Sequence, residues 1–333
     1  MSVKPESASA LFAGPFALAT LSAPGLPRFP ALVTADSQVV DLRAALRDDA
    51  LTMRGLLDQW AVALPLLHKL AADPGTERRP LADFRVHAPI EPRQVLQSGA
   101  NYRQHVIDLH VAHRDPADDR SEEERRAEAA EIMDRRAAED LPYMFIGLPS
   151  AITGPYDDVV LPSWAEKPDW ELELAVVIGK PAYQVPVEEA LEHVAGYTIA
   201  NDLTDRATVF RRDMPQIGTD WLRSKNAPGF TPLGPWIVPA GSIADPDDLR
   251  VTLRLNGETM QDESTKDMIF NVARMVAYAS QTARLLPGDL ILTGSPAGNG
   301  MHWGRLLRDG DVMEGSVTGL GVQRTRCVSE DAS

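Results

Sequence analysis

The chain has 333 residues, a single cysteine and a formal net charge of −15 at pH 7. This acidic total argues against nucleic acid or an anionic membrane surface as a partner, and the absence of a run of about eighteen apolar residues argues against a membrane span. Because Cys327 stands alone, an intrachain disulfide is excluded, which agrees with a reducing cytoplasmic location.

The first ninety residues predict a small N-terminal α/β domain, residues 1–90. Residues 16–42 alternate apolar and small polar side chains around Gly25, Pro27 and Pro30, which is typical of short strands and turns. Helical patterns follow over residues 44–71 and end in a polar linker at 73–79. The run Val95 to Gly99 then predicts the first strand of a larger domain, residues 91–333.

A charged stretch, Arg114 to Asp140, interrupts the start of the larger domain. Its alternating Glu, Asp and Arg with Ala favour a solvated helix joined by ion pairs four residues apart. Because the stretch follows His105 directly, a mobile lid over about 111–140 stays open as the alternative.

From Asp157 onward, short β-type runs dominate. Residues 187–195 predict one helix, and a second helix is expected to begin near Ser264, with Asp267 three residues later as in a capping box, and to end before Pro287. Its apolar stripe consists of Met268, Ile269, Val272, Met275, Val276 and Ala279. The pattern predicts an α+β fold that is mainly β, with a rolled or barrel-like mixed sheet.

Three carboxylates carry the chemical signal. If residues 170–178 form a strand, Glu171 and Glu173 point to the same face, and Asp202 follows the next apolar run, 194–200. Three hard oxygen ligands without paired Cys or His indicate Mg²⁺, Mn²⁺ or Ca²⁺ and argue against zinc. The competing interpretation is the wet face of an amphipathic strand.

Several spaced motifs occur in unbroken order between about residues 90 and 327. They are Gly99-Ala100-Asn101-Tyr102 with His105, Trp170-Glu171-Leu172-Glu173-Leu174, Ala200-Asn201-Asp202, Lys225, Pro287-Gly288-Asp289 with Thr293-Gly294-Ser295-Pro296, and Gly319-Leu320-Gly321. Together these motifs resemble the fumarylacetoacetate hydrolase superfamily. The resemblance implies a β-roll catalytic domain, a homodimer, and 2-oxo acids or their enols as substrates.

The same resemblance assigns roles to individual residues. It implies a Mg²⁺ or Mn²⁺ site at Glu171, Glu173 and Asp202. His105 would be the general base, and Asp108 stands where many members carry a Glu that orients this His. Lys225 would hold the substrate carboxylate or offset enolate charge. Arg206 would act near the metal aspartate or, alternatively, form a structural ion pair with a metal carboxylate.

Substrate contacts are implied for Tyr102, Ser295 and Gly294, the last because glycine permits close approach. Two positions depart from the family pattern. Val209 stands where hydrolase and decarboxylase members often carry Gln, and residues 147–150 supply no lysine. Both departures remove polar contacts and favour either a more apolar substrate tail or a reaction with fewer hydrogen-bonding demands.

The leading hypothesis is a metal-dependent hydrolase that cleaves a C–C bond in a 2,4-dioxo acid of the acylpyruvate or fumarylacetoacetate type. The alternative is an isomerase, tautomerase or decarboxylase that uses the same enol chemistry. A non-catalytic, metal-stabilised binding protein is disfavoured, because such a protein would not need His105 and Lys225.

Overall fold

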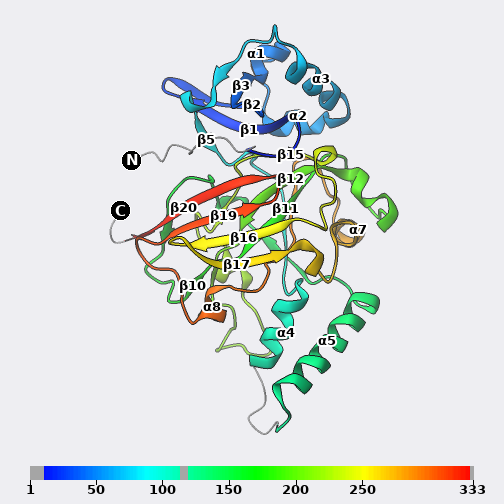
Figure 1. Cartoon of the computed structure of the whole chain (residues 1–333), viewed down its shortest axis with the longest axis vertical. Coiled ribbons are helices and arrows are strands. Elements are labelled where there is room, and N and C mark those ends of the chain that lie inside the picture. Colours follow the sequence, from blue (N-terminus) through cyan, green and yellow to red (C-terminus); the bar gives the residue numbers. More distant parts are fainter. Residues whose placement is uncertain (1–10, 113–118, 331–333) are drawn as a thin grey trace.

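The computed structural model describes residues 11–112 and 119–330. Figure 1 shows three parts along the long axis of the molecule: a sheet with helices at the N-terminal end, a central body of two larger sheets, and a helical hairpin at the opposite end. The central body is mainly β with few helices, so the fold class predicted from the sequence is confirmed.

The N-terminal part is a five-stranded sheet with three helices. Its strand order is β4-β3-β2-β1-β5. The predicted helical stretch 44–71 is divided into three helices, because Asp41 and Thr52 cap separate helices and Gln59 ends the second. The elements are β1 (Phe16–Ala23), β2 (Leu26–Thr34), β3 (Gln38–Asp41), α1 (Leu42–Leu46), α2 (Met53–Asp58), α3 (Trp60–Ala72), β4 (Arg79–Pro80), η1 (Leu81–Asp83) and β5 (Arg85–His87).

A mixed six-stranded sheet forms one half of the central body, in the order β15-β12-β11-β18-β6-β7. Only the β18–β6 pair within it is parallel. Its strands are β6 (Val95–Ser98), β7 (Met144–Gly147), β11 (Leu172–Ile178), β12 (Val194–Asn201), β15 (Val238–Pro239) and β18 (Leu290–Leu292).

The second sheet has the order β17-β16-β19-β20-β9, and two short ribbons, β10–β13 and β14–β8, complete the body. These strands are β8 (Ile152–Thr153), β9 (Val159–Leu161), β10 (Pro168–Asp169), β13 (Thr204–Asp205), β14 (Thr231–Pro232), β16 (Arg250–Leu255), β17 (Glu258–Ser264), β19 (Val312–Val317) and β20 (Gly321–Ser329). The remaining helices are α4 (Arg103–Ala112), α5 (Glu122–Glu139), η2 (Pro149–Ala151), η3 (Val187–His193), α6 (Trp221–Lys225), η4 (Ala240–Ser242), η5 (Thr265–Asp267), α7 (Val272–Thr282) and α8 (Gly300–Trp303).

Strand β11 is buried along its whole length because both faces of the six-stranded sheet are covered. Leu172 and Leu174 face a core that is shared with the sheet β17-β16-β19-β20-β9. Gly315 of β19 packs so close to Leu172 that a side chain at this position would overlap it. Ala175 and Val177 face a second core that includes Leu18 of the N-terminal sheet. Alternation along one strand therefore joins the two larger sheets on one side and the N-terminal part on the other.

Two predicted helices differ from those observed. Ser264 caps the short η5, and Asn271 caps α7 by accepting a hydrogen bond from the Arg274 N–H at 3.0 Å, so Met268 and Ile269 precede the helix. Residues 187–193 form the 3₁₀-helix η3, and the chain enters β12 at Val194. The predicted start of the first helix and the predicted end of the second were wrong. A side-chain cap decides where α7 begins, and strand pairing decides where η3 ends.

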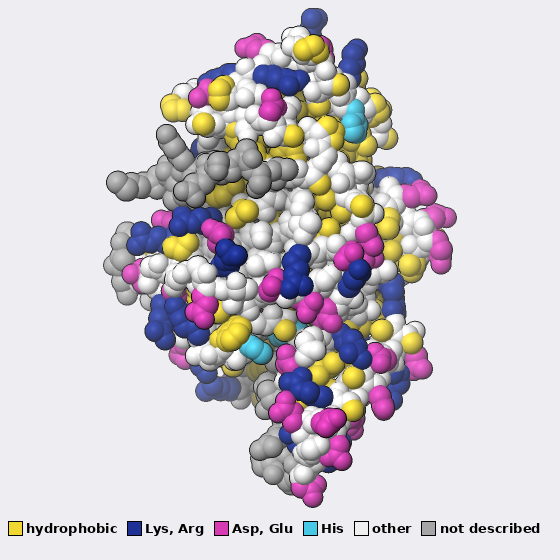
Figure 2. Space-filling view, viewed as in Figure 1, with side chains coloured by type: hydrophobic (Ala, Val, Ile, Leu, Met, Phe, Trp, Pro, Cys, Tyr) yellow, Lys and Arg dark blue, Asp and Glu magenta, His cyan; other side chains and the backbone are white. Residues whose placement is uncertain are grey.

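The charged stretch contains α5, whose first turn is stabilised by a capping box of Ser121 and Glu124. One face of α5 is exposed, and Arg125, Ala129 and Met133 on the other face are buried. Helix α5 packs against α4, and Figure 2 shows acidic and basic side chains interspersed over this end of the molecule. Part of the predicted lid, residues 113–118, lies outside the described residues. Within the described ranges, no helix has the length and apolar character needed to cross a membrane.

Candidate metal and substrate site

The three predicted carboxylates meet where β11 begins and β12 ends. Because Leu172 pairs with Asn201 in antiparallel register, Glu171 and Asp202 flank the same rung of the sheet, and Glu173 lies one position inside β11. The Asp202 N–H also donates to the Glu171 carbonyl at 2.8 Å. One oxygen from each carboxylate lies within 4.8 Å of the others. Strand pairing thus brings together residues that are 31 positions apart, from 171 to 202.

Lys225, at the end of α6, lies among these carboxylates. Its Nζ is 2.6 Å from Glu171 Oε2 and 2.6 Å from Asp202 Oδ2. Burial opposes ionisation of Glu171, but Arg206 and Lys225 outweigh it and lower the Glu171 pKa to about 2. Burial raises the pKa of Asp202 to about 6 in spite of the Lys225 charge. The lysine therefore contacts the carboxylates directly and does not point into solvent.

Glu173 has one oxygen that fits a cation. Its Oε2 accepts a hydrogen bond from the Gly294 N–H at 2.7 Å, whereas its buried Oε1 has no hydrogen-bond partner among the described residues. Burial, with the neighbouring Asp202, raises the pKa of Glu173 well above its usual range. A buried carboxylate oxygen without a partner, next to two more carboxylates, fits a hard divalent cation. The residues present therefore suit Mg²⁺ or Mn²⁺.

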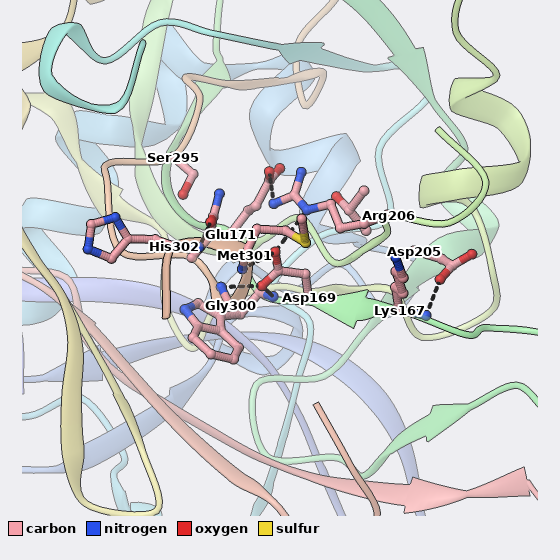
Figure 3. A network of polar contacts seen from close by, with 12 residues as sticks. Lys167, Asp169, Glu171, Asp205, Arg206, Ser295, Gly300, Met301 and His302 are labelled. Atoms are coloured by element: carbon pink, nitrogen blue, oxygen red, sulfur yellow. Dashed lines mark hydrogen bonds and ion pairs between the residues drawn. The ribbon is translucent and has the colours of Figure 1, made fainter. Parts of the chain in front are cut away.

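Arg206 joins the site to a buried aspartate that the sequence interpretation did not single out. Its Nη2 is 2.6 Å from Glu171 Oε1, and its Nε donates to Asp169 Oδ2 at 2.8 Å, as Figure 3 shows. Asp169 also accepts hydrogen bonds from the N–H groups of Gly300 at 2.5 Å and Met301 at 3.3 Å. The arginine thus forms the structural ion pair that was one of its two predicted roles, and Asp169 attaches the α8 turn to it.

His105 lies in the first turns of α4, near the carboxylates. Burial lowers the pKa of His105 below its ordinary value; Glu171 opposes this effect and Arg206 adds to it. The expected orienting partner, Asp108, is engaged elsewhere. Its Oδ1 accepts from Gln104 Nε2 at 2.8 Å and from Arg126 Nη1 of α5 at 2.8 Å. The hydrogen bonds that the structure gives to Asp108 do not include His105.

The three predicted substrate contacts occupy different positions. The Tyr102 hydroxyl is fully buried without a hydrogen-bond partner in the described chain, and burial, followed by the Glu173 charge, raises its pKa well above the usual range. Ser295 accepts from Gln261 Nε2 at 2.8 Å. Gly294, at φ +89°, donates its N–H to Glu173, so this donor is already engaged by a protein carboxylate.

Sequence reasoning missed a buried glutamine and an aromatic pair. Gln97 Nε2 donates to Asp202 Oδ1 at 2.5 Å, and a polar residue inside the apolar run of β6 was the available signal. The rings of Phe145 and Trp221 stack with centroids 4.5 Å apart, next to the Lys225 ammonium. No local pattern links Phe145 with Trp221, because β7 and α6 are distant in the chain.

Most of the chain is similar to known proteins. Residues 94–328 match the family model described as "Fumarylacetoacetate (FAA) hydrolase C-terminal". The chain is 44% identical over 192 residues to a 2,4-didehydro-3-deoxy-L-rhamnonate hydrolase of Sphingomonas sp., which covers 57% of the chain and 65% of that protein. It is 42% identical over 183 residues to the human protein "Oxaloacetate tautomerase FAHD2B, mitochondrial". This match covers 54% of the chain and 57% of the human protein. These matches therefore span less than two thirds of either relative.

A solved structure with the same fold is maleylpyruvate hydrolase from Sphingobium sp. SYK-6, in complex with manganese(II) ion and pyruvate. The TM-score is 0.71 at 26% sequence identity, and the match covers 94% of this chain and 99% of that one.

Proposed function

We propose, because the chain belongs to the fumarylacetoacetate hydrolase family, that it hydrolyses a carbon–carbon bond in a 2,4-dioxo acid of the acylpyruvate or fumarylacetoacetate type. One observation carries the proposal: Glu171, Glu173 and Asp202 converge within 4.8 Å around a buried lysine. Similarity to a hydrolase and to a tautomerase supports enol chemistry of this kind.

The three carboxylates would hold Mg²⁺ or Mn²⁺, and the manganese in the maleylpyruvate hydrolase structure supports this choice. A bound divalent cation supplies a Lewis acid for the 2-oxo group of a substrate.

The side chains of this chain provide the remaining steps. His105, whose lowered pKa keeps the imidazole neutral, removes a proton from the water that attacks the 4-carbonyl. Lys225 and Arg206 offset negative charge beside the carboxylates. The Tyr102 hydroxyl, buried without a hydrogen-bond partner among the described residues, is free to donate to a substrate oxygen.

Hydrolysis of the 2,4-dioxo acid breaks the bond between C3 and C4 and consumes one water molecule. Water oxygen forms a bond to C4, the C3–C4 bond breaks, and its electron pair stays on C3 as the enolate of pyruvate. The proton that His105 accepted returns to C3, and the products are pyruvate and a carboxylic acid. Charge on the departing enolate develops next to Lys225, which explains why a buried cation is retained there.

The second candidate is proton transfer without water: tautomerisation, double-bond isomerisation or decarboxylation of a 2-oxo acid. Val209 favours it, because this buried apolar side chain stands where hydrolase members often carry Gln. The residues required are nearly the same, so only the products separate the two candidates.

The deciding experiment follows products by NMR in D₂O. The purified protein with Mg²⁺ or Mn²⁺ is incubated with acetylpyruvate, fumarylpyruvate and oxaloacetate, with EDTA as the control. Metal-dependent release of pyruvate and a second acid supports the hydrolase. Deuterium exchange, an isomer or CO₂ without cleavage would overturn it in favour of the second candidate.

Two further proposals concern the oligomeric state and the cellular location. A homodimer is supported by large apolar side chains that stay exposed around β7 and α6, namely Leu141, Ile146, Phe210, Ile217 and Leu222. Light scattering after gel filtration tests it, and a monomeric mass would contradict it. A cytoplasmic location is supported by Cys327, which is buried and unpaired.

A further inference from the structure

Three aromatic side chains form a continuous group at the edge of the six-stranded sheet. The rings of Phe145 on β7 and Trp221 on α6 are stacked at 4.5 Å with an interplanar angle of 15°. The Trp221 Nε1–H donates to the Tyr143 hydroxyl at 2.7 Å, which fixes the orientation of the indole. The stack therefore presents a defined aromatic surface.

This surface adjoins the candidate metal site. Lys225 Nζ lies 5.7 Å from the Phe145 centroid and 5.9 Å from the Trp221 centroid, and the same atom is 2.6 Å from Asp202. Phe145 also pairs across the sheet with Gln97, which donates to Asp202. The rings therefore lie within reach of a substrate whose oxo-acid group is held at the carboxylates.

The aromatic group differs from the core aromatics of this protein. Trp170 and Trp236 are fully buried, whereas Phe145 and Trp221 are only half-buried and Tyr143 is 45% exposed. An aromatic surface that is held in place and still accessible can take a planar ligand. Lys225 and Arg206 are already ion-paired with protein carboxylates, so a second substrate carboxylate would lose water here without gaining either of these cations.

We propose that the Phe145–Trp221 stack binds the tail of the substrate and selects 2-oxo acids with an aryl tail over 2-oxo acids that end in a carboxylate. This inference rests on the proposed function, because it places the oxo-acid group at Glu171, Glu173 and Asp202. The buried Val209, in place of a polar residue, agrees with an apolar tail.

The test compares two inert ligands, 2-oxo-4-phenylbutanoate and 2-oxoglutarate. They are identical from C1 to C4 and differ only in a phenyl group or a carboxylate, and neither has the 4-carbonyl that hydrolysis requires. Isothermal titration of the full chain loaded with Mn²⁺ should give a Kd about tenfold lower for the phenyl ligand, since an aromatic contact contributes that much.

Variants then assign the preference to the stack. Trp221→Leu should weaken binding of the phenyl ligand about tenfold while 2-oxoglutarate changes less than about threefold, and Trp221→Phe should restore the preference. Phe145→Leu is the second variant if Trp221→Leu does not fold. The matched control is Tyr183→Ala, which removes a ring that is 47% exposed, faces Arg284 at 5.1 Å and follows the far end of β11.

The outcomes separate this inference from the proposed function. Equal affinity for the two ligands, or equal weakening of both by Trp221→Leu, would overturn the inference and leave acylpyruvate hydrolysis standing. A retained phenyl preference with no metal-dependent cleavage of 2,4-dioxo-4-phenylbutanoate, the acylpyruvate that carries the same phenyl group, would support the stack and contradict hydrolysis. Failure of both ligands to bind the Mn²⁺-loaded chain would overturn both.

Discussion

At the scale of single residues, the charges of the site do not balance without a cation. Glu171, Glu173, Asp202 and Asp169 bring four negative charges when ionised, and Lys225 and Arg206 bring two positive ones. The difference, four minus two, is the charge of one divalent ion. The raised pKa of Glu173 has burial and this excess as its causes.

The first prediction replaces Glu173 with its neutral isostere. Glu173→Gln removes one negative charge from a buried cluster, so the metal-free protein should keep or raise its Tm. Mn²⁺ affinity should fall more than about 100-fold, because even the partners of metal ligands are worth about 10- to 100-fold. Thermal unfolding and Mn²⁺ electron paramagnetic resonance measure the two effects. Unchanged Mn²⁺ binding would rule out Glu173 as a ligand.

The second prediction concerns the base. The pKa of His105 is lowered from its ordinary value of 6.5, chiefly by burial, so the midpoint of its protonation lies below pH 6.5. The value of kcat/KM should therefore fall as the pH is lowered, with a midpoint below pH 6.5, and a midpoint above pH 6.5 would contradict this role for His105. Mn²⁺ occupancy is measured at each pH, so that loss of metal is not mistaken for protonation of the base.

Replacement of the same residue gives the third prediction. His105→Asn should lower kcat about 100- to 10,000-fold, the usual contribution of a general base, with Mn²⁺ affinity unchanged. Steady-state kinetics and Mn²⁺ titration provide the comparison. A variant that keeps wild-type kcat would show that another group accepts the proton.

At the scale of elements, α4 and α5 form a pair that carries His105 toward the site. Arg126 of α5 bonds Asp108 of α4 at 2.8 Å, and Arg103 of α4 bonds Asp134 of α5 at 3.0 Å. The shorter side chain of Asp108 is occupied by Gln104 and Arg126. Asp108, which was expected to orient His105, instead binds Arg126 of α5. Helix α5 therefore holds α4, the helix that carries His105, in position.

The fourth prediction compares these two ion pairs. Arg126→Gln should lower kcat up to about fivefold, since a partly exposed pair contributes at most about 1 kcal/mol, and Arg126→Lys should restore part of the loss. Asp134→Asn breaks the other α4–α5 pair and serves as the control, with little effect on kcat. Equal losses in the two variants would mean that hairpin rigidity alone is responsible.

At the scale of the whole molecule, the N-terminal sheet is continuous with the catalytic body. Leu18 exchanges two backbone hydrogen bonds with Ile237, both at 2.9 Å, and its side chain lies in the core that also holds Ala175 of β11. The predicted boundary near residue 90 thus separates two parts of the chain that share a core. This arrangement couples folding of the first 90 residues to the sheet that carries the carboxylates.

The fifth prediction follows from that shared core. Leu18→Ala should lower the free energy of unfolding by about 2–5 kcal/mol, because it leaves a cavity at a fully buried position. Unfolding in urea should remain one transition, monitored both by circular dichroism and by tryptophan fluorescence. Two separate transitions would show that residues 1–90 fold independently.

The sequence by itself determined which residues were predicted to form the site, because the patterns that indicate them are local. The spacing of Glu171 and Glu173, the position of Asp202 after an apolar run and the ordered motifs around His105 and Lys225 were all readable along the chain. Strand periodicity and chain order predict the carboxylate cluster. The ordered motifs identify the family by their resemblance to it.

Only the tertiary structure decided the contacts that cross between elements. Gln97 donates a hydrogen bond to Asp202, and Arg126 donates one to Asp108. Phe145 stacks on Trp221. These contacts form because strands and helices that are distant in the chain become neighbours in the fold. Such contacts depend on sheet order and register, which no local pattern records. The physical reason is that the whole core determines burial and strand pairing, so the contacts of each candidate site residue are fixed only in the folded chain.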